Sequence, residues 1–205
     1  LARDLACEDK RITVDQTPMN LGCSGARNVA LEKANGQLVA FLDSDDQWLP
    51  DKLDRQVKFM QQTGAALTYT LFRCLSQDGQ STGPVVPIPS QFDYKSLLKQ
   101  NRIATLTAMV DVSQTGPIRM ANLPRDDYIL WLSILRRGFV AKGLQDDLAR
   151  YRLVPGSVSS NKIWGAKKAW FLYRKTQDLN LPEALWYYLN YVIIATYKHI
   201  KYFRA

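Results

Sequence analysis

The stretch "QLVAFLDSDDQWLP" at residues 37–50 decides the fold of this 205-residue chain. Its continuous apolar run, from Leu38 to Leu42, is typical of a strand that is buried on both faces of a sheet. Asp43, Asp45 and Asp46 then follow within four residues, although the chain carries a net charge of +8. Open α/β sheets bind their ligands beyond the carboxyl ends of the strands. The stretch therefore predicts an α/β protein with an acidic site at one such end.

The segments on both sides of this stretch alternate between strand and helix patterns. The expected elements are, in order, a strand at 11–16, a helix from Ser24 as N-cap to about residue 34, the strand at 37–43, a helix over 50–62 and a strand over 65–75. A proline at the start of the second helix and Gly64 after its end are typical helix boundaries. This β-α-β-α-β order predicts a parallel sheet.

The rest of the chain continues the α/β pattern and ends in helices. We expect a loop at 76–92, a short helix at 94–101, a strand at 104–112, a helix over 124–139 with Asp126 as N-cap and Gly138 as terminator, a strand and loop at 148–161, and helices at 164–178 and 182–204. The length suits one sheet domain, which we place at 1–160, followed by a C-terminal helical extension at 161–205.

Composition argues against several classes of protein. Cys7, Cys23 and Cys74 are far apart and form no C-x-x-C pair, which argues against a zinc ribbon and against a disulfide framework. The basic residues are scattered and no nucleic-acid-binding signature is present, so we expect no nucleic-acid partner. The most apolar tract, at 184–197, is shorter than the roughly 20 residues that a membrane-spanning helix needs.

The acidic cluster has two interpretations. The aspartates can cap the next helix or close a turn. Alternatively, the D-x-D spacing of Asp43 and Asp45 presents hard oxygen ligands to Mg²⁺ or Mn²⁺, which would bridge to diphosphate oxygens. Such a cation would also neutralise the mutual repulsion of the aspartates.

Two further segments carry charges at the starts of helices. "NLGCSGARN" (20–28) is a glycine loop entering a helix, which either has no further role or places phosphate near the helix N-terminus with Arg27 adding charge. In "RDDYILWL" (125–132), Asp126 and Asp127 either complement the helix dipole or supply a general base. Because His199 is the only histidine, base chemistry here would use a carboxylate, and a helix N-terminus should keep that carboxylate ionised near neutral pH.

The last segment, "EALWYYLNYVIIATYKHIKYFRA" (183–205), also has two interpretations. It can be a helix packed over the sheet. It can instead be an interfacial helix, with Trp186 at the level of the lipid headgroups and Lys198, Lys201 and Arg204 meeting anionic lipid. The second is favoured because aromatic residues occupy nearly every face of the helix.

Together these segments resemble family 2 glycosyltransferases with the GT-A fold. The resemblance covers three blocks in the same order and spacing: "NLGCSGARNVALEKANGQLVAFLDSDDQWLPDKLDRQ", "RDDYILWLSILRRG" and "LARYRLVPGSVS". It implies an inverting transferase that uses Mn²⁺ or Mg²⁺ and a nucleotide-sugar donor. It also implies that the first strands of the fold are absent from this sequence, because the I-P-x-Y-N segment and a base-contacting Asp do not precede Leu1.

The resemblance also implies roles for individual residues. Asp45 and Asp43 match the metal-binding D-x-D pair, and Asp127, next to Asp126, matches the catalytic base. The expected donor contacts are Asn20, Gly22, Arg27, Asn28, Asp43, Ser44 and Asp45. Acceptor-side or phosphate contacts are expected at Tyr151, Arg152 and Ser157. The sequence departs from the family pattern at Asp126 (usually Glu), Ile129, Ser133 and Val154 (often His).

We therefore expect a glycosyltransferase that passes a sugar, from UDP-sugar or another nucleotide sugar, to a polysaccharide or lipid-linked oligosaccharide. We expect it to be cytoplasmic and peripheral at the inner face of the cytoplasmic membrane. The alternative is a non-catalytic basic module that binds anionic membrane or polymer, with the acids only capping helices.

Overall fold

The computed structural model describes residues 2–154 and 162–202, without the side chains of residues 162–164, 195 and 197–202. The helices are α1 (Ala2–Glu8), α2 (Gly22–Lys33), α3 (Lys52–Thr63), α4 (Tyr94–Lys99), the 3₁₀ turn η1 (Thr105–Thr107), α5 (Val112–Thr115), α6 (Asp126–Arg136), α7 (Lys162–Phe171), the π-helical turn η2 (Leu172–Thr176) and α8 (Leu181–Tyr202). The strands are β1 (Leu38–Ala40), β2 (Gln47–Trp48), β3 (Leu67–Leu75), β4 (Thr82–Val86), β5 (Gln91–Phe92), β6 (Met109–Asp111) and β7 (Ala141–Arg152).

The strands form one mixed sheet in the order β1-β6-β3-β7-β2, with β4 paired to β3 and β5 paired to β7. Only β3 and β7 run parallel among the described pairs, with Leu67 opposite Ala141. The other pairs, including β1 with β6, are antiparallel. The prediction of a parallel sheet is therefore wrong, because the first strand of the expected β-α-β-α-β order does not form and β1 pairs with the antiparallel β6 instead of with β3.

Two local predictions are also wrong. Residues 11–16 form no strand, and Ile12 and Val14 are 39% and 40% exposed, because their alternating pattern finds no partner strand. The predicted loop at 76–92 contains β4 and β5. A turn in which the Ser76 N–H donates to the Ser81 carbonyl (2.9 Å) brings β4 against β3.

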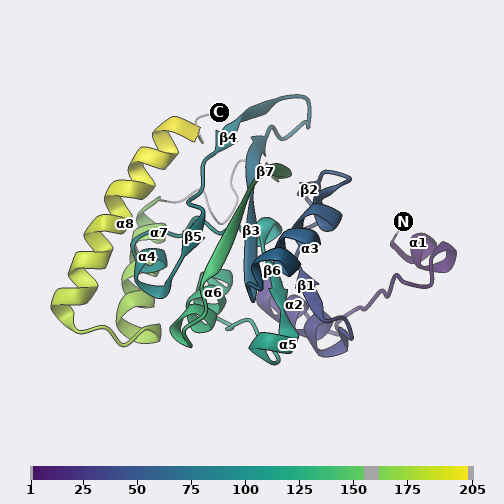
Figure 1. Ribbon diagram of the computed structural model, residues 1–205, viewed down its shortest axis with the longest axis horizontal. Coiled ribbons are helices and arrows are strands. Elements are labelled where there is room, and N and C mark those ends of the chain that lie inside the picture. Colours follow the sequence, from purple (N-terminus) through teal and green to yellow (C-terminus); the bar gives the residue numbers. More distant parts are fainter. Residues whose placement is uncertain (1, 155–161, 203–205) are drawn as a thin grey trace.

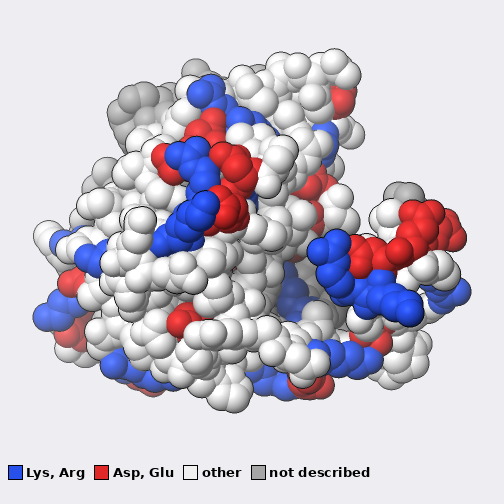
Figure 2. Space-filling view, turned by 45° about the vertical axis from the view of Figure 1, so that its right-hand side comes forward, with Lys and Arg blue, Asp and Glu red and all other residues white. Residues whose placement is uncertain are grey.

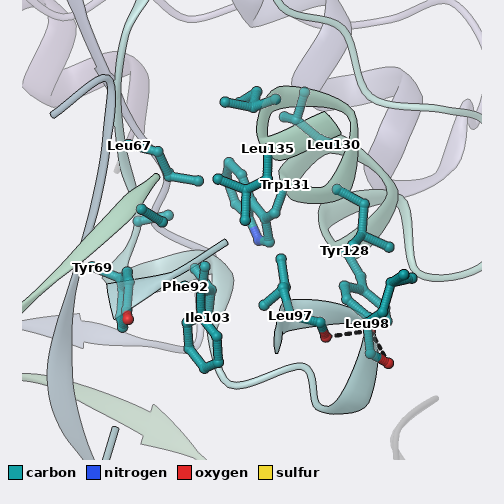
Figure 3. Packing of buried hydrophobic residues seen from close by; sticks show 14 of the residues in the cluster. Leu67, Tyr69, Phe92, Leu97, Leu98, Ile103, Tyr128, Leu130, Trp131 and Leu135 are labelled. Carbon is teal, nitrogen blue, oxygen red and sulfur yellow. Dashed lines mark hydrogen bonds between the residues drawn. The ribbon is translucent and has the colours of Figure 1, made fainter. Parts of the chain in front are cut away.

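Helix α6 is buried in the core over most of its surface, with Ser133 and Arg136 exposed. Trp131, Tyr128 and Leu132 are fully buried, and Figure 3 shows Trp131 and Tyr128 among leucines of α4 and β3. The Tyr128 hydroxyl donates to the backbone oxygens of Leu97 (2.7 Å) and Leu98 (3.2 Å). This packing fixes the N-terminal turn of α6, where Asp126 and Asp127 lie.

The C-terminal helices belong to the same core. Figure 1 shows α7 and α8 side by side at the left of the sheet with α4 beside them, whereas α1 stands apart at the right. Leu172, Tyr173 and Ala184 are buried in the cluster that contains Trp131. The helical extension therefore covers the sheet domain, as the packed-helix interpretation predicts for its inner face.

Candidate functional site

Arg27 of α2 joins two acidic segments that are far apart in the sequence. Its guanidinium lies 2.6 and 2.7 Å from the two carboxylate oxygens of Asp43, just after β1. It also lies 3.1 Å from Oδ2 of Asp126, 99 residues further along the chain. Arg27 and Asp126 are only 16% and 15% exposed, so solvent screens their ion pair weakly. The predicted donor segment and the predicted base segment thus meet at one guanidinium.

The start of α2 explains how Arg27 reaches this position. The helix begins at Gly22, whose φ of +67° favours glycine, and Asn20 accepts the Gly22 N–H through Oδ1 at 2.9 Å. Ser24 is not the N-cap that the sequence predicted, since Leu21 occupies that position. The Ser24 hydroxyl instead donates to Asp126 Oδ2 at 2.9 Å, which gives that carboxylate a second partner.

Asn28, one residue further, is committed to the backbone of another segment. It is buried, its amide donates to the Met120 carbonyl (2.9 Å), and its Oδ1 accepts the Met120 N–H (2.8 Å). These two bonds fix the segment before α6 against α2. Both polar atoms of the Asn28 side chain thus have a protein partner, and its contact with a donor stays a prediction.

The three aspartates after β1 have different surroundings. The Asp46 N–H donates to the Asp43 carbonyl at 3.1 Å, which closes a tight turn. Asp46 Oδ1 accepts the Arg152 N–H at 2.9 Å, and burial raises the pKa of Asp46 to about 6, helped by the charges of Asp45 and Asp43. Ser44 and Asp45 are exposed, and the Asp45 carboxylate has no partner within the described part of the chain. Asp45 is therefore the carboxylate most available to a ligand.

Asp127 lies in the first turn of α6, partly buried. Its Oδ2 accepts from the Thr105 hydroxyl at 2.9 Å, and its Oδ1 accepts the Tyr128 N–H at 2.7 Å. Burial raises the pKa of Asp127, and the charge of Asp126 adds to the rise. A helix N-terminus alone would lower this pKa, so burial outweighs the helix dipole here. The predicted N-cap is also wrong: Arg125, with φ +67°, occupies that position and Asp126 is the first helical residue.

Arg152 joins the acidic turn to the β3–β4 connection. Its guanidinium donates to the backbone oxygens of Asp45 (2.7 Å), Gln77 (2.9 Å) and Ser76 (3.2 Å). Tyr151 packs edge-on against Phe72, with ring centroids 6.3 Å apart. Ser157 lies outside the described residues. The geometry thus gives Arg152 a positioning contact, whereas the acceptor-side roles of Tyr151 and Arg152 remain predictions.

Sequence reasoning missed the hydroxyl partners of the site. Thr105 comes from the η1 turn and touches Asp127, and Ser24 touches Asp126 instead of capping α2. No local signal marks either residue, because both contacts depend on how distant segments pack.

The fit of a divalent cation can be judged from the donor atoms present. The described residues contain no group of three or more His, Cys, Asp or Glu side chains that could hold a metal ion. Asp45 is free, and Asp43 is 45% exposed although it is paired with Arg27. Mg²⁺ and Mn²⁺ in phosphate-transfer sites commonly take one or two carboxylates and complete their shell with phosphate oxygens and water. Asp45 with Asp43 fits that mode of binding.

A mostly apolar hollow of about 260 Å³ adjoins the Arg27–Asp43 pair. It lies between α2 and β1, and Leu31, Val39 and Phe41 contribute to its lining. A ligand in this hollow would lie against the charged pair, so both features can serve one bound molecule.

The sequence of the chain is similar to those of known glycosyltransferases. The profile of the family described as "Glycosyl transferase family 2" matches residues 1–114. The chain is 43% identical over 193 residues to TuaG of Bacillus subtilis (strain 168), a glycosyltransferase provisionally assigned to teichuronic acid biosynthesis, covering 94% of this chain and 77% of TuaG. It is 33% identical to the Escherichia coli protein WfgD, a UDP-Glc:alpha-D-GlcNAc-diphosphoundecaprenol beta-1,3-glucosyltransferase, over 95% of this chain and 76% of WfgD.

Solved structures agree at the level of fold. The crystal structure of S. aureus TarS 1-349 in complex with UDP-GlcNAc superposes with a TM-score of 0.61 at 17% identity. The superposition covers 89% of this chain and 57% of the TarS chain. The two proteins therefore share a fold.

Proposed function

Because the chain belongs to glycosyltransferase family 2 and has the α/β architecture of GT-A enzymes, we propose that it transfers a sugar from a nucleotide-sugar donor to an acceptor hydroxyl with inversion. The observation that carries the proposal is the bridge of Arg27 between Asp43 and Asp126. It sets the carboxylates expected to serve the donor beside the turn that holds the expected base.

In the proposed reaction, Asp127 takes the proton from the acceptor hydroxyl. The acceptor oxygen forms a bond to the anomeric carbon as the bond from that carbon to the donor's diphosphate oxygen breaks, and the nucleoside diphosphate leaves. Attack opposite the leaving group inverts the anomeric centre. A raised pKa makes Asp127 a stronger base, provided that it is ionised at the working pH. Thr105 holds one of its oxygens and so orients the carboxylate.

Asp45, with Asp43, would hold the Mn²⁺ or Mg²⁺. When bound, the ion supplies positive charge that stabilises the departing diphosphate. Arg27 adds fixed positive charge at the same place, and its pairing with Asp43 holds that carboxylate in position.

The named relatives support a class of donor and a class of acceptor for the proposed reaction. TarS has been crystallised with UDP-GlcNAc and with UDP, which supports a UDP-sugar as donor for this chain. WfgD acts on a diphosphoundecaprenol-linked sugar, and TuaG is provisionally assigned to teichuronic acid biosynthesis. We therefore propose a growing surface polysaccharide or lipid-linked oligosaccharide as acceptor, met by a cytoplasmic protein at the inner face of the cytoplasmic membrane.

A transfer assay with UDP-sugars, Mn²⁺ and lipid-linked acceptors tests the proposal. Asp127→Asn removes the base but keeps the shape of the side chain, so turnover should fall by about 10²–10⁴-fold. Asp54→Asn is the matched control, because Asp54 is a 64% exposed aspartate of α3 that pairs only with Lys58 among the described residues. Wild-type turnover by Asp127→Asn would refute the assignment of the base.

The alternative of a non-catalytic basic module has less support. Figure 2 shows Lys and Arg interspersed with Asp and Glu on the face in view, where no continuous basic field forms. Family membership, in turn, places the chain among transferases.

A further inference from the structure

The outward face of α8 is a stripe of large apolar side chains. Trp186 is 61% exposed and Ile193 is 68% exposed. The stripe consists of Leu185, Trp186, Leu189, Val192 and Ile193. These residues recur every three or four positions, so they lie on one side of the helix over a little more than two turns. We call this set the α8 stripe.

The α8 stripe is not needed to hold the helix in place. The inner face of α8 already packs through Ala184, which is fully buried, and through Tyr188, whose ring meets Trp170 edge-on at 5.5 Å. Tyr187 lies 6.3 Å from the ring of Tyr173. No charged residue occurs in the sequence between Glu183 and Lys198, whereas a solvated helix face normally carries charges. The exposed, uncharged surface of the α8 stripe therefore indicates a site of contact with a partner.

Helix α7, which packs against α8, and the η2 turn after it carry exposed cations close in sequence to an exposed aromatic residue. Phe171 at the end of α7 is 41% exposed, and Lys167, Arg174 and Lys175 close by are exposed. No helix in the described ranges is long and apolar enough to cross a bilayer. An apolar stripe with a tryptophan, next to cations, is the chemistry of a helix that lies in the headgroup region of an anionic membrane. The side chains of Lys198, Lys201 and Arg204 lie outside the described residues and are not needed for this argument.

We propose that the outward face of the α7–α8 hairpin docks on an anionic phospholipid surface, with the α8 stripe inserted among the headgroups. The inference deepens the proposed function, since it would bring the site to a lipid-linked acceptor. A second copy of the chain fits less well, because a two-fold contact through α8 would bring the cations of both α7 segments together.

The experiment is vesicle co-sedimentation of the full chain without donor or acceptor. Phosphatidylcholine vesicles containing phosphatidylglycerol should bind the protein, and pure phosphatidylcholine vesicles should bind it at least about tenfold more weakly, with binding to the former falling as salt rises. Trp186 should report insertion as a blue shift of tryptophan fluorescence. Failure of the wild-type chain to bind anionic vesicles would overturn the proposal.

Two variants distinguish insertion of the α8 stripe from nonspecific adsorption to the vesicles. Leu185→Glu with Leu189→Glu should weaken partitioning at least about tenfold, because each removes an inserted leucine. Leu53→Glu is the matched control, since Leu53 is a 44% exposed leucine on α3. A second variant, with Lys167, Arg174 and Lys175 changed to Gln, should lose the preference for anionic vesicles while keeping the apolar stripe.

The remaining outcomes are also decisive. Undiminished vesicle binding by both variants would overturn the proposal. So would a wild-type dimer in sedimentation velocity that becomes monomeric in the stripe variant, since this would assign the α8 stripe to a contact with a second copy of the chain. Circular dichroism should show each variant to be folded. Vesicle binding with no sugar transfer would count against the proposed function alone, and transfer to a soluble acceptor with no vesicle binding would count against docking alone.

Discussion

Arg27 is the residue through which the two acidic segments hold each other. Its planar fork places Nη2 against both oxygens of Asp43 and Nη1 against Oδ2 of Asp126, so one side chain sets the separation of the two carboxylates. A lysine at the same place would keep the charge but could not present this fork. The geometry of the site thus depends on the shape of the cation as much as on its charge.

Arg27→Lys should therefore lower kcat/KM for the nucleotide-sugar donor between about tenfold and a hundredfold, because small misplacements of catalytic groups are costly. Steady-state kinetics against donor concentration measures this. Arg119→Lys makes the same change in an exposed ion pair with Glu32 and should leave kcat/KM unchanged. Equal effects of the two substitutions would mean that the bridge has no special role.

Lys52 offers a second test at this scale, this time of stability. It is fully buried, its ammonium donates to Gln56 Oε1 at 2.7 Å and lies 4.3 Å from the centre of the Trp48 ring, and burial lowers its pKa to about 8. Between pH 8 and its unfolded pKa near 10.4, the unfolded chain binds more protons than the folded one. The free energy of unfolding should therefore rise from pH 8 to about 10, by an amount on the order of 2 kcal/mol.

Urea unfolding as a function of pH measures this rise. Above pH 10 the gain should reverse, because burial raises the pKa of Tyr69 and Tyr173 and their unfolded phenols ionise first. Lys52→Met should remove the rise. Lys58→Met, which changes a 65% exposed lysine on the same helix, should retain it.

At the scale of elements, the sequence predicts those whose pattern is long and whose ends are marked. The helix expected at 50–62 is α3, and Gly64 ends it with a φ of +62°, as the glycine rule requires. The strand expected at 65–75 is β3, and the expected 124–139 helix contains α6. The short strands β4 and β5 could not be predicted, because they owe their conformation to pairing with β3 and β7.

The candidate site likewise has features that the sequence could predict and features that it could not. The acids themselves could be predicted, because Asp43 follows an apolar run and Asp126 opens a periodic helix. Their meeting through Arg27 could not, since it depends on the order of strands in the sheet. The two aspartates of the D-x-D pair also differ in their surroundings, since Asp45 is free and Asp43 is paired with Arg27. The spacing of the two residues in the sequence cannot predict this difference.

The loop after β1 and the β3–β4 connection should behave as one element because Arg152 ties them. Arg152→Ala removes three hydrogen bonds to backbone oxygens of these loops. Hydrogen exchange should quicken at residues 43–46 and 76–79, and KM for the donor should rise about three- to tenfold while kcat changes less. Arg150→Ala is the control. Arg150 also lies on β7, and its ion-pair partner Asp147 stays paired with Arg73 when the Arg150 guanidinium is removed. Faster exchange at only one of the two loops would contradict the coupling.

At the scale of the whole molecule, the sheet joins two surfaces with different chemistry. The acidic site comprises the loop after β1 and the first turn of α6. The α7–α8 hairpin, drawn at the left in Figure 1, reaches that turn through Arg125, which donates to the Gly165 carbonyl at 3.0 Å. Both surfaces rest on α6, whose first turn carries Asp127 and whose apolar residues meet the C-terminal helices. Ligand binding at the site should therefore stabilise the molecule as a unit, in proportion to occupancy.

This stabilisation by bound ligand can be used to test how the cation is held. Mn²⁺ alone should barely change the melting temperature, because too few carboxylates lie near Asp45 to bind the ion tightly. UDP and Mn²⁺ together should raise it, because the diphosphate oxygens supply the ligands that the ion lacks. At a UDP concentration about 100 times Kd, the stabilisation of about 2.7 kcal/mol should raise the melting temperature by about 5–10 °C. Asp45→Asn should remove most of this shift, and the exposed Asp54→Asn should not. If Mn²⁺ alone gave the full shift, the chain would hold the ion without phosphate; if UDP alone gave it, the cation would have no part in donor binding.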